Sequence, residues 1–93
     1  MHWHILRFDL SGREVAEQQR IIEVLERLKT IPLVRRAVVG RDVDNSDVVG
    51  VVIRFDKSSD VAEYRAHATH AEVRSFLVAN GLRATHLLSL IHI

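Results

Sequence analysis

The stretch Val48–Asp56 reads VVGVVIRFD, and it decides the fold. Apolar residues fill both sets of alternating positions along it, a pattern typical of a strand that is covered on both faces. A polar turn at Asp44–Asp47 comes before it, and Leu33–Val43 before that turn predicts another strand. The two strands are expected to pair as a hairpin.

A strand and a helix are predicted before the hairpin. Residues His2–Leu10 alternate with a period of two, which indicates a strand. Ser11–Glu14 matches the capping box, in which a hydroxyl residue is followed three positions later by Glu, and predicts a helix that ends near Lys29. Pro32 ends this element because proline lacks the amide donor that a helix needs.

The residues after the hairpin predict a broken helix and a last strand. Ser58–Asp60 begins a short helix that ends near His67, and a second capping box, Thr69–Glu72, restarts it. Asn80–Gly81 ends the restarted helix, since these residues tolerate left-handed backbone. The segment Arg83–Ile93 is the predicted last strand.

The predicted order is βαββαβ, the arrangement of a ferredoxin-like α+β domain with a four-stranded antiparallel sheet and helices on one face. The whole chain, residues 1–93, is expected to form this single domain. Two helices cover one face of such a sheet and leave the other face of Val48–Asp56 uncovered. A second copy of the chain is the simplest cover, so a homodimer is predicted.

The composition favours a globular protein: 47% of the residues are apolar, 27% are charged, and the formal net charge is +1. Acidic and basic residues are interspersed, so neither a nucleic-acid partner nor a membrane surface is expected. An RNA-binding module of this topology would carry exposed aromatic residues on its middle strands, where this chain has Val and Ile. The chain contains no Cys, which excludes disulfides, thiolate metal sites and a Cys nucleophile, and a cytoplasmic location fits that absence.

Reactive side chains concentrate in Tyr64–Glu72, YRAHATHAE, which places one phenol and two imidazoles within seven residues. With Thr69 as N-cap, His70 is the first residue of the restarted helix, and the positive end of that helix disfavours a charged imidazole. A neutral His70 can accept a proton, and Tyr64 can donate one or hold a substrate oxygen. The competing interpretation is structural: His70 closes the helix joint, and Tyr64 packs with its hydroxyl in water.

His4 shares a strand face with Leu6 and Phe8, because alternate residues of a strand point the same way. If that face meets the helices, His4 lines the same pocket and can orient a substrate oxygen; a buried His bonded to the backbone is the alternative. The predicted pocket lining comprises Leu6, Phe8, Ile21, Val24, Val51, Ile53, His67, Val73 and Leu77. Ordinary core packing is the default interpretation of the apolar members, and His67 is expected to bond exposed backbone at the helix break.

Two histidine pairs could supply ligands to a metal ion. The pair His2 and His4 shares a strand face, and His67 and His70 have a helical spacing that can bring two ligands together. No acidic residue stands in a ligand pattern beside them, and the two pairs need not converge. No metal site is therefore predicted.

The chain resembles the stress-responsive α/β-barrel (Dabb) family over essentially its whole length. The opening strand of that family, the glycine that ends its second strand and its phenylalanine-ended third strand are similar to His4–Leu10, Gly40 and Val51–Asp56. The family segment Tyr-x-x-His-Pro-x-His is matched by Tyr64, His67 and His70, with Ala68 in place of the proline.

The resemblance implies a homodimer whose two sheets close into one barrel, with the helices outside. Some relatives act on polyketides; in a plant member, a His and a Tyr that match His70 and Tyr64 drive an intramolecular aldol closure, and a His that matches His4 lines the cavity. The implied function is a cofactor-independent cyclase or isomerase acting on an enolisable poly-β-ketone. The alternative is a non-catalytic dimeric stress-response protein that binds a small hydrophobic molecule.

Overall fold

The computed structural model describes residues 1–83 and 85–91. Its elements follow the predicted order, with an added 3-10 turn: β1 (His2–Asp9), α1 (Val15–Glu26), η1 (Arg27–Thr30), β2 (Arg36–Arg41), β3 (Val48–Phe55), α2 (Asp60–Ala66), α3 (Ala68–Ala79) and β4 (Thr85–Ile91). The last two residues of the predicted final strand, His92 and Ile93, lie outside the described residues.

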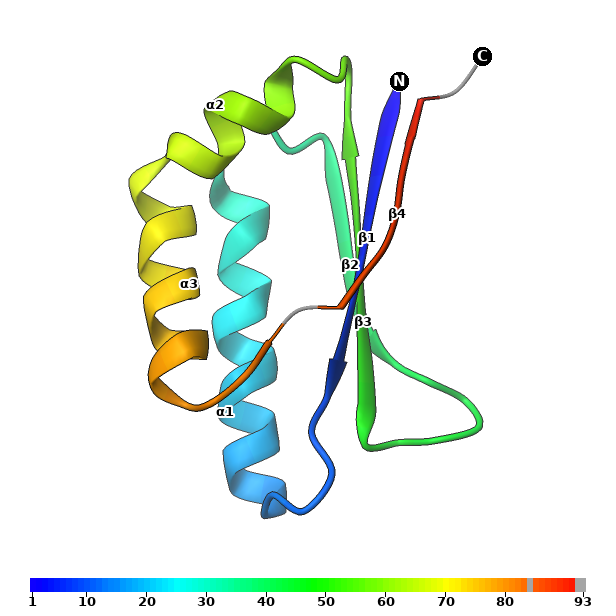
Figure 1. Ribbon diagram of the computed structural model, residues 1–93, viewed down its shortest axis with the longest axis vertical. Helices are drawn as coiled ribbons and strands as arrows, with labels where there is room; N and C mark the ends of the chain where they lie inside the picture. The colour runs from blue at the N-terminus through cyan, green and yellow to red at the C-terminus, as the bar shows by residue number, and fades with distance from the viewer. Residues whose placement is uncertain (84, 92–93) are drawn as a thin grey trace.

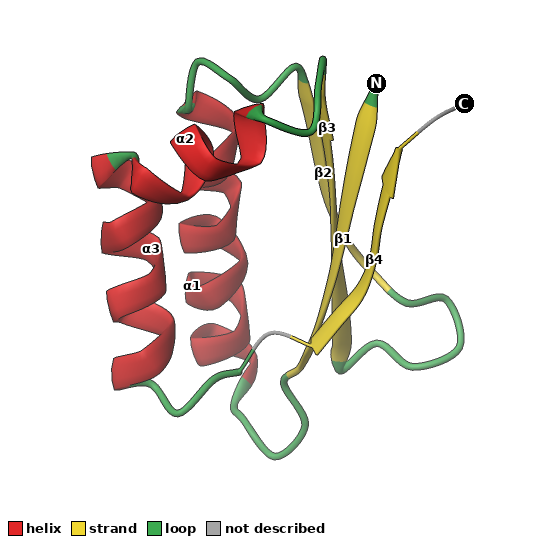
Figure 2. Ribbon diagram, turned by 45° about the horizontal axis from the view of Figure 1, so that its top comes forward, coloured by secondary structure: helices red, strands yellow, loops and turns green. Residues whose placement is uncertain are grey.

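Within the described residues, the strands form one antiparallel sheet in the order β2-β3-β1-β4. All three helices lie on the same side of this sheet, and α1 lies nearer to the sheet than α3 does (Figure 1, Figure 2). The predicted hairpin is confirmed as the pairing of β2 with β3, in which Val39 faces Val51. The α+β ferredoxin-like fold is therefore confirmed.

The core lies between the sheet and α1. One set of alternating residues on β3 is fully buried under the helices: Val49, Val51, Ile53 and Phe55. Ile21 and Leu25 of α1 are fully buried against them, and each such side chain contributes about 1.5–3 kcal/mol by leaving water. In the other set on β3, Val48 is buried, whereas Gly50, Val52 and Arg54 are only half-buried, because no element among the described residues covers that face.

The predicted capping box at Ser11 is wrong. The N-cap of α1 is Glu14, which makes no side-chain capping bond. Ser11 instead donates from its backbone N–H and its hydroxyl to Asp9 Oδ1, at 2.9 and 2.6 Å. Gly12, with φ of 81°, then turns the chain, so the hydroxyl that the pattern assigns to the helix belongs to a turn before it.

The predicted break in the second helix is confirmed, but Thr69 is not its cap. His67 occupies the N-cap of α3 with extended backbone (φ −68°, ψ 141°), and its Nδ1 accepts a hydrogen bond from the Thr69 N–H at 3.1 Å. An imidazole nitrogen does here what a Ser or Thr oxygen does at most N-caps. His70 becomes the third residue of α3 rather than its first.

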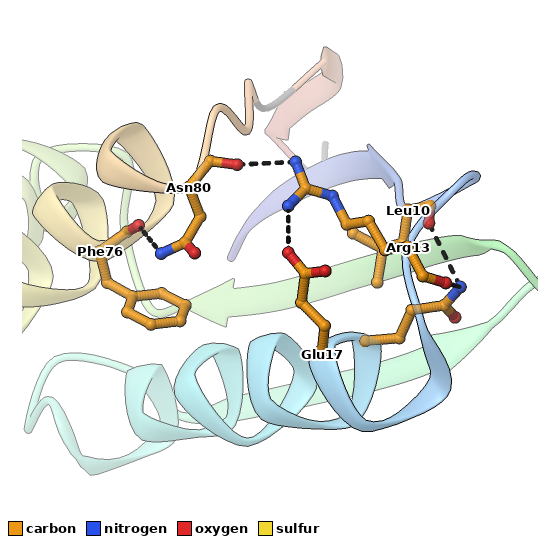
Figure 3. A network of polar contacts seen from close by, with 6 residues as sticks. Leu10, Arg13, Glu17, Phe76 and Asn80 are labelled. Atoms are coloured by element: carbon orange, nitrogen blue, oxygen red, sulfur yellow. Dashed lines mark hydrogen bonds and ion pairs between the residues drawn. The ribbon is translucent and has the colours of Figure 1, made fainter.

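The far end of α3 is held beside α1. Arg13 donates to the Asn80 carbonyl at 2.7 Å and pairs with Glu17 of α1 at 2.7 Å (Figure 3). Gly81 follows with φ of 71°, the left-handed conformation expected from the Asn80–Gly81 stop signal. This contact ties the end of α3 to the start of α1 and not to the sheet. No helix of the described residues is long and apolar enough to cross a bilayer.

Ala68→Pro is expected to stabilise the protein by about 0.4–1 kcal/mol, because proline at the first helical position restricts the unfolded chain and breaks no helical hydrogen bond. His67 already has the extended backbone that a following proline favours. The matched control is Ala71→Pro, which removes the bond from the Ala71 N–H to the His67 carbonyl and should destabilise by about 3 kcal/mol. Urea denaturation measures both, and destabilisation by Ala68→Pro would contradict the assigned cap.

Candidate functional site

A cavity of about 730 Å³ lies between β1 and α3. It forms because α3 packs against α1 and η1 and not on the sheet. The described residues that line it come from six segments: His4, Leu6 and Phe8 of β1; Leu25 of α1; Leu28 of η1; Tyr64 and Arg65 of α2; His70, Val73, Arg74, Leu77 and Val78 of α3; and Gly81, Leu82 and Arg83 after α3. Exposed residues such as Arg74 and Val78 form its mouth, so the cavity opens to solvent.

Four of the predicted apolar lining residues line this cavity: Leu6, Phe8, Val73 and Leu77. The other predicted residues lie elsewhere. Ile21, Val51 and Ile53 are fully buried in the core, Val24 packs against the core, and His67 caps α3. Sequence periodicity identifies the buried face of each element, but it does not show which part of that face lacks a covering helix.

The sequence interpretation missed several lining residues: Leu25, Leu28, Arg65, Arg74, Val78, Gly81, Leu82 and Arg83. Arg65 and Arg74 had a usable signal, since each lies within four positions of a candidate catalytic residue. No sequence signal indicated Arg83, because the turn after α3 brings it to the cavity.

Tyr64 is buried at the wall of the cavity, with 1% of its surface exposed. Its ring meets the His70 ring edge to face at 4.7 Å between centroids, and it packs on Phe55 at 5.1 Å. The hydroxyl is buried and has no hydrogen-bond partner among the residues that the structure describes. A buried hydroxyl left in that state costs about 1–3 kcal/mol, and a ligand oxygen would remove the cost.

Burial also determines the protonation state of Tyr64. It raises the pKa of the phenol well above the ordinary value of 10.0, because the phenolate loses its hydration, and the nearby Arg65 opposes this only in part. The hydroxyl therefore keeps its proton across the physiological range and acts as a hydrogen-bond donor.

His70 is half-buried beside Tyr64 and lines the same cavity. Its pKa is lowered from 6.5, first by burial and then by the positive charges of Arg65 and Arg74, while a hydrogen bond with the Arg65 backbone acts in the opposite direction. The imidazole is thus neutral near pH 7, chiefly for a reason other than the helix terminus. A neutral imidazole that donates from one ring nitrogen carries a lone pair on the other and can accept a proton there.

His4 enters the cavity from β1. It is 4% exposed, and its ring centroid lies 6.4 Å from that of Tyr64. His4, Leu6 and Phe8 all line the cavity, so the strand face that carries them does meet the helices. The structure therefore brings His4, Tyr64 and His70 together in the cavity lining, with the Tyr64 ring next to both imidazoles. Among the described residues, no group of three His, Cys, Asp or Glu side chains is arranged to hold a metal ion.

The profile of the stress-responsive A/B barrel domain family matches residues 3–82. No curated protein sequence matches the chain.

Solved structures share the fold at low sequence identity. A Deinococcus radiodurans protein that is provisionally named an antibiotic biosynthesis monooxygenase superposes with a TM-score of 0.74 at 11% identity. The superposition covers 100% of this chain and 96% of that protein. A protein of Arabidopsis thaliana gives 0.74 at 18% identity, covering 100% and 99%. A dimeric ferredoxin-like protein of unknown function from Jannaschia sp. CCS1 gives 0.66 at 18% identity, covering 94% and 97%.

The pKa of His70 is expected to lie below 6.5 and to rise in Arg74→Gln, because the substitution removes a positive charge that disfavours imidazolium. NMR titration of the imidazole carbon-bound protons measures both values. The control is Arg20→Gln, which removes an exposed arginine whose guanidinium stacks on Phe76 instead of lining the cavity. A wild-type pKa at or above 6.5 would contradict the described environment.

Proposed function

Since the chain belongs to the family of stress-responsive A/B barrel domains, we propose that its cavity binds an enolisable poly-β-ketone and closes it into a ring by an intramolecular aldol reaction. The observation that carries the proposal is the buried Tyr64 hydroxyl, which lacks a partner among the described residues and lies beside a neutral His70. One group can donate a hydrogen bond to a substrate oxygen, and the other can take a proton from the carbon next to it.

The proposed reaction begins when the lone pair of His70 removes a proton from the carbon between two carbonyl groups. Tyr64 donates a hydrogen bond to the carbonyl oxygen that becomes the enolate, and so stabilises the charge as it develops. The enolate carbon then bonds to a second carbonyl carbon of the same molecule, and the resulting alkoxide takes the proton back from the His70 imidazolium. No electrons are gained or lost overall, so proton transfers alone complete the cycle.

The cavity supports this assignment in two further ways. Its volume of about 730 Å³ falls in the range of small-molecule sites, and Leu6, Phe8, Val73 and Leu77 offer an apolar wall against which a flexible chain can fold. Holding the two reacting carbons together lowers the entropic part of the activation barrier for ring closure. His4 is assigned the role of orienting a second substrate oxygen.

The same features suit a non-catalytic protein that holds a small hydrophobic molecule, since an apolar cavity with a few polar groups is what such a ligand requires. A monooxygenase-like activity is a second enzymatic alternative, because a structure with this fold carries that provisional name. Binding without turnover would favour the first alternative, and uptake of dissolved oxygen in place of ring closure would favour the second.

The uncovered sheet face supports a dimer. Trp3 and Ile5 of β1 and Val52 of β3 are half-buried on that face, and Val38 of β2 is 46% exposed. Their burial by a second copy would close two sheets into one barrel and leave each cavity on the outside, between sheet and helices. The dimeric relative of the same fold supports this assembly.

His70→Gln and Tyr64→Phe are each expected to lower kcat/KM for cyclisation of a 3,5-dioxoacyl thioester by about 10²–10⁴-fold, because each removes one partner of the proton transfer. Arg20→Gln is the control, since it changes an exposed side chain that packs on Phe76 and does not line the cavity. Product formation followed by ultraviolet absorbance gives the rates. Unchanged turnover in both site variants would eliminate the assignment.

The pH profile offers a check on the same roles. Because neutral His70 is the active form, wild-type kcat/KM should fall toward acid with a midpoint below 6.5. The raised pKa of Tyr64 should keep the rate level on the alkaline side up to its ordinary value of 10.0. His70→Gln should lose the acid limb.

Val52→Glu is expected to convert the dimer to a monomer, because each buried carboxylate would lose its hydration at the interface. Light scattering after size-exclusion chromatography should show the molar mass fall from twice 10.6 kDa to 10.6 kDa. Val15→Glu, at the 80%-exposed first residue of α1, is the control and should leave the mass unchanged. A wild-type chain that elutes as a monomer would refute the dimer.

A further inference from the structure

Three arginines surround the mouth of the cavity: Arg65 at the end of α2, Arg74 one turn after His70 on α3, and Arg83 after α3. All three are exposed, and none of their guanidinium groups forms an ion pair or hydrogen bond with a residue that the structure describes. Other arginines do have such partners: Arg13 pairs with Glu17, and Arg27 pairs with Glu72. The mouth therefore carries three guanidinium groups that form no ion pair with an acidic side chain of the described residues.

The lining itself is one-sided in charge. Among the described residues, the cavity is lined by three arginines, two histidines and no Asp or Glu, although the chain as a whole carries a net charge of only +1. A positive cluster in an almost neutral protein repels itself, and a bound anion would relieve that repulsion.

A second, shallower hollow of about 540 Å³ adjoins the mouth. It shares Arg65, His70 and Arg74 with the main cavity, so these side chains lie at the boundary between the two. The inner space has apolar walls and the outer space has guanidinium groups at its edge. A ligand that fills both would need an apolar body and a charged end.

We propose that Arg65, Arg74 and Arg83 bind an anionic group, a carboxylate or a phosphate, at one end of a ligand whose apolar chain occupies the cavity. Guanidinium groups hold both anions through paired N–H donors. The inference rests on the proposed function for the location of the site and adds its substrate class: an acidic acyl chain, held by its charged end so that the interior carbonyl groups reach Tyr64 and His70.

The test uses binding alone, so it does not depend on turnover. Decanoate, decyl phosphate and decanol share one chain length and differ in the end group. Binding is measured by calorimetric titration of the wild-type protein below the micellar concentration of each probe. The more tightly bound of the two anions should bind about tenfold more tightly than decanol, a difference of about 1.4 kcal/mol in binding free energy. Added salt should weaken binding of the anions and leave decanol unaffected.

Variants then assign the effect to the mouth. Arg65→Gln combined with Arg74→Gln should remove most of the preference for the anion, whereas Arg20→Gln, outside the cavity, should preserve it. Unchanged decanol binding in every variant shows that the apolar cavity is intact. Tighter binding of decyl phosphate identifies a phosphate-bearing ligand, and tighter binding of decanoate identifies a carboxylate.

Two results would overturn the proposal: equal affinity of wild-type protein for decanol and both anions, or an anion preference that survives the double substitution. Either can occur while cyclisation still depends on His70 and Tyr64. Conversely, the anion preference can hold in a protein that shows no turnover. Failure of this inference is therefore distinguishable from failure of the cyclase assignment.

Discussion

The hydrogen bond from the Thr69 N–H to His67 Nδ1 is the contact on which the site depends. It lets the chain leave a helical path for one residue and begin α3 in a new direction. Tyr64 stays on α2 and points into the protein, while His70 arrives from α3, so two residues close in sequence meet ring to ring at 4.7 Å. An unbroken helix would turn six residues through about 600°, which carries Tyr64 and His70 to faces well apart.

The same redirection creates the cavity. After the joint, α3 packs along α1 and η1, and Arg13 ties its end to the start of α1. The space that α3 leaves over β1 is where His4, Leu6 and Phe8 face inward. Close packing is the rule in protein interiors, so an open space lined by a buried hydroxyl without a partner among the described residues lowers stability locally. The fully buried core under α1 offsets that loss.

The two faces of the sheet carry different kinds of residue. The helix-covered face holds the core and the reactive groups, and the other carries apolar residues such as Val52 that a second copy can bury. The cavity on the helix-covered face combines three features: arginines at its mouth, apolar walls, and a neutral His70 imidazole beside Tyr64. Each has a separate physical cause: guanidinium groups with no ion-pair partner among the described residues, the offset of α3, and the burial of His70.

Local patterns in the sequence determined the strands, the hairpin, the break between the helices, and the nearness of Tyr64 to His70. Such features depend on neighbours within a few positions: alternation on β3, the Asn80–Gly81 stop, and polar residues at the joint. Tertiary structure alone decided that Leu25 lines the cavity and Ile21 does not, and that Arg83 reaches the mouth. These outcomes depend on where α3 comes to rest against α1, a balance of contacts between residues distant in sequence that no local pattern records.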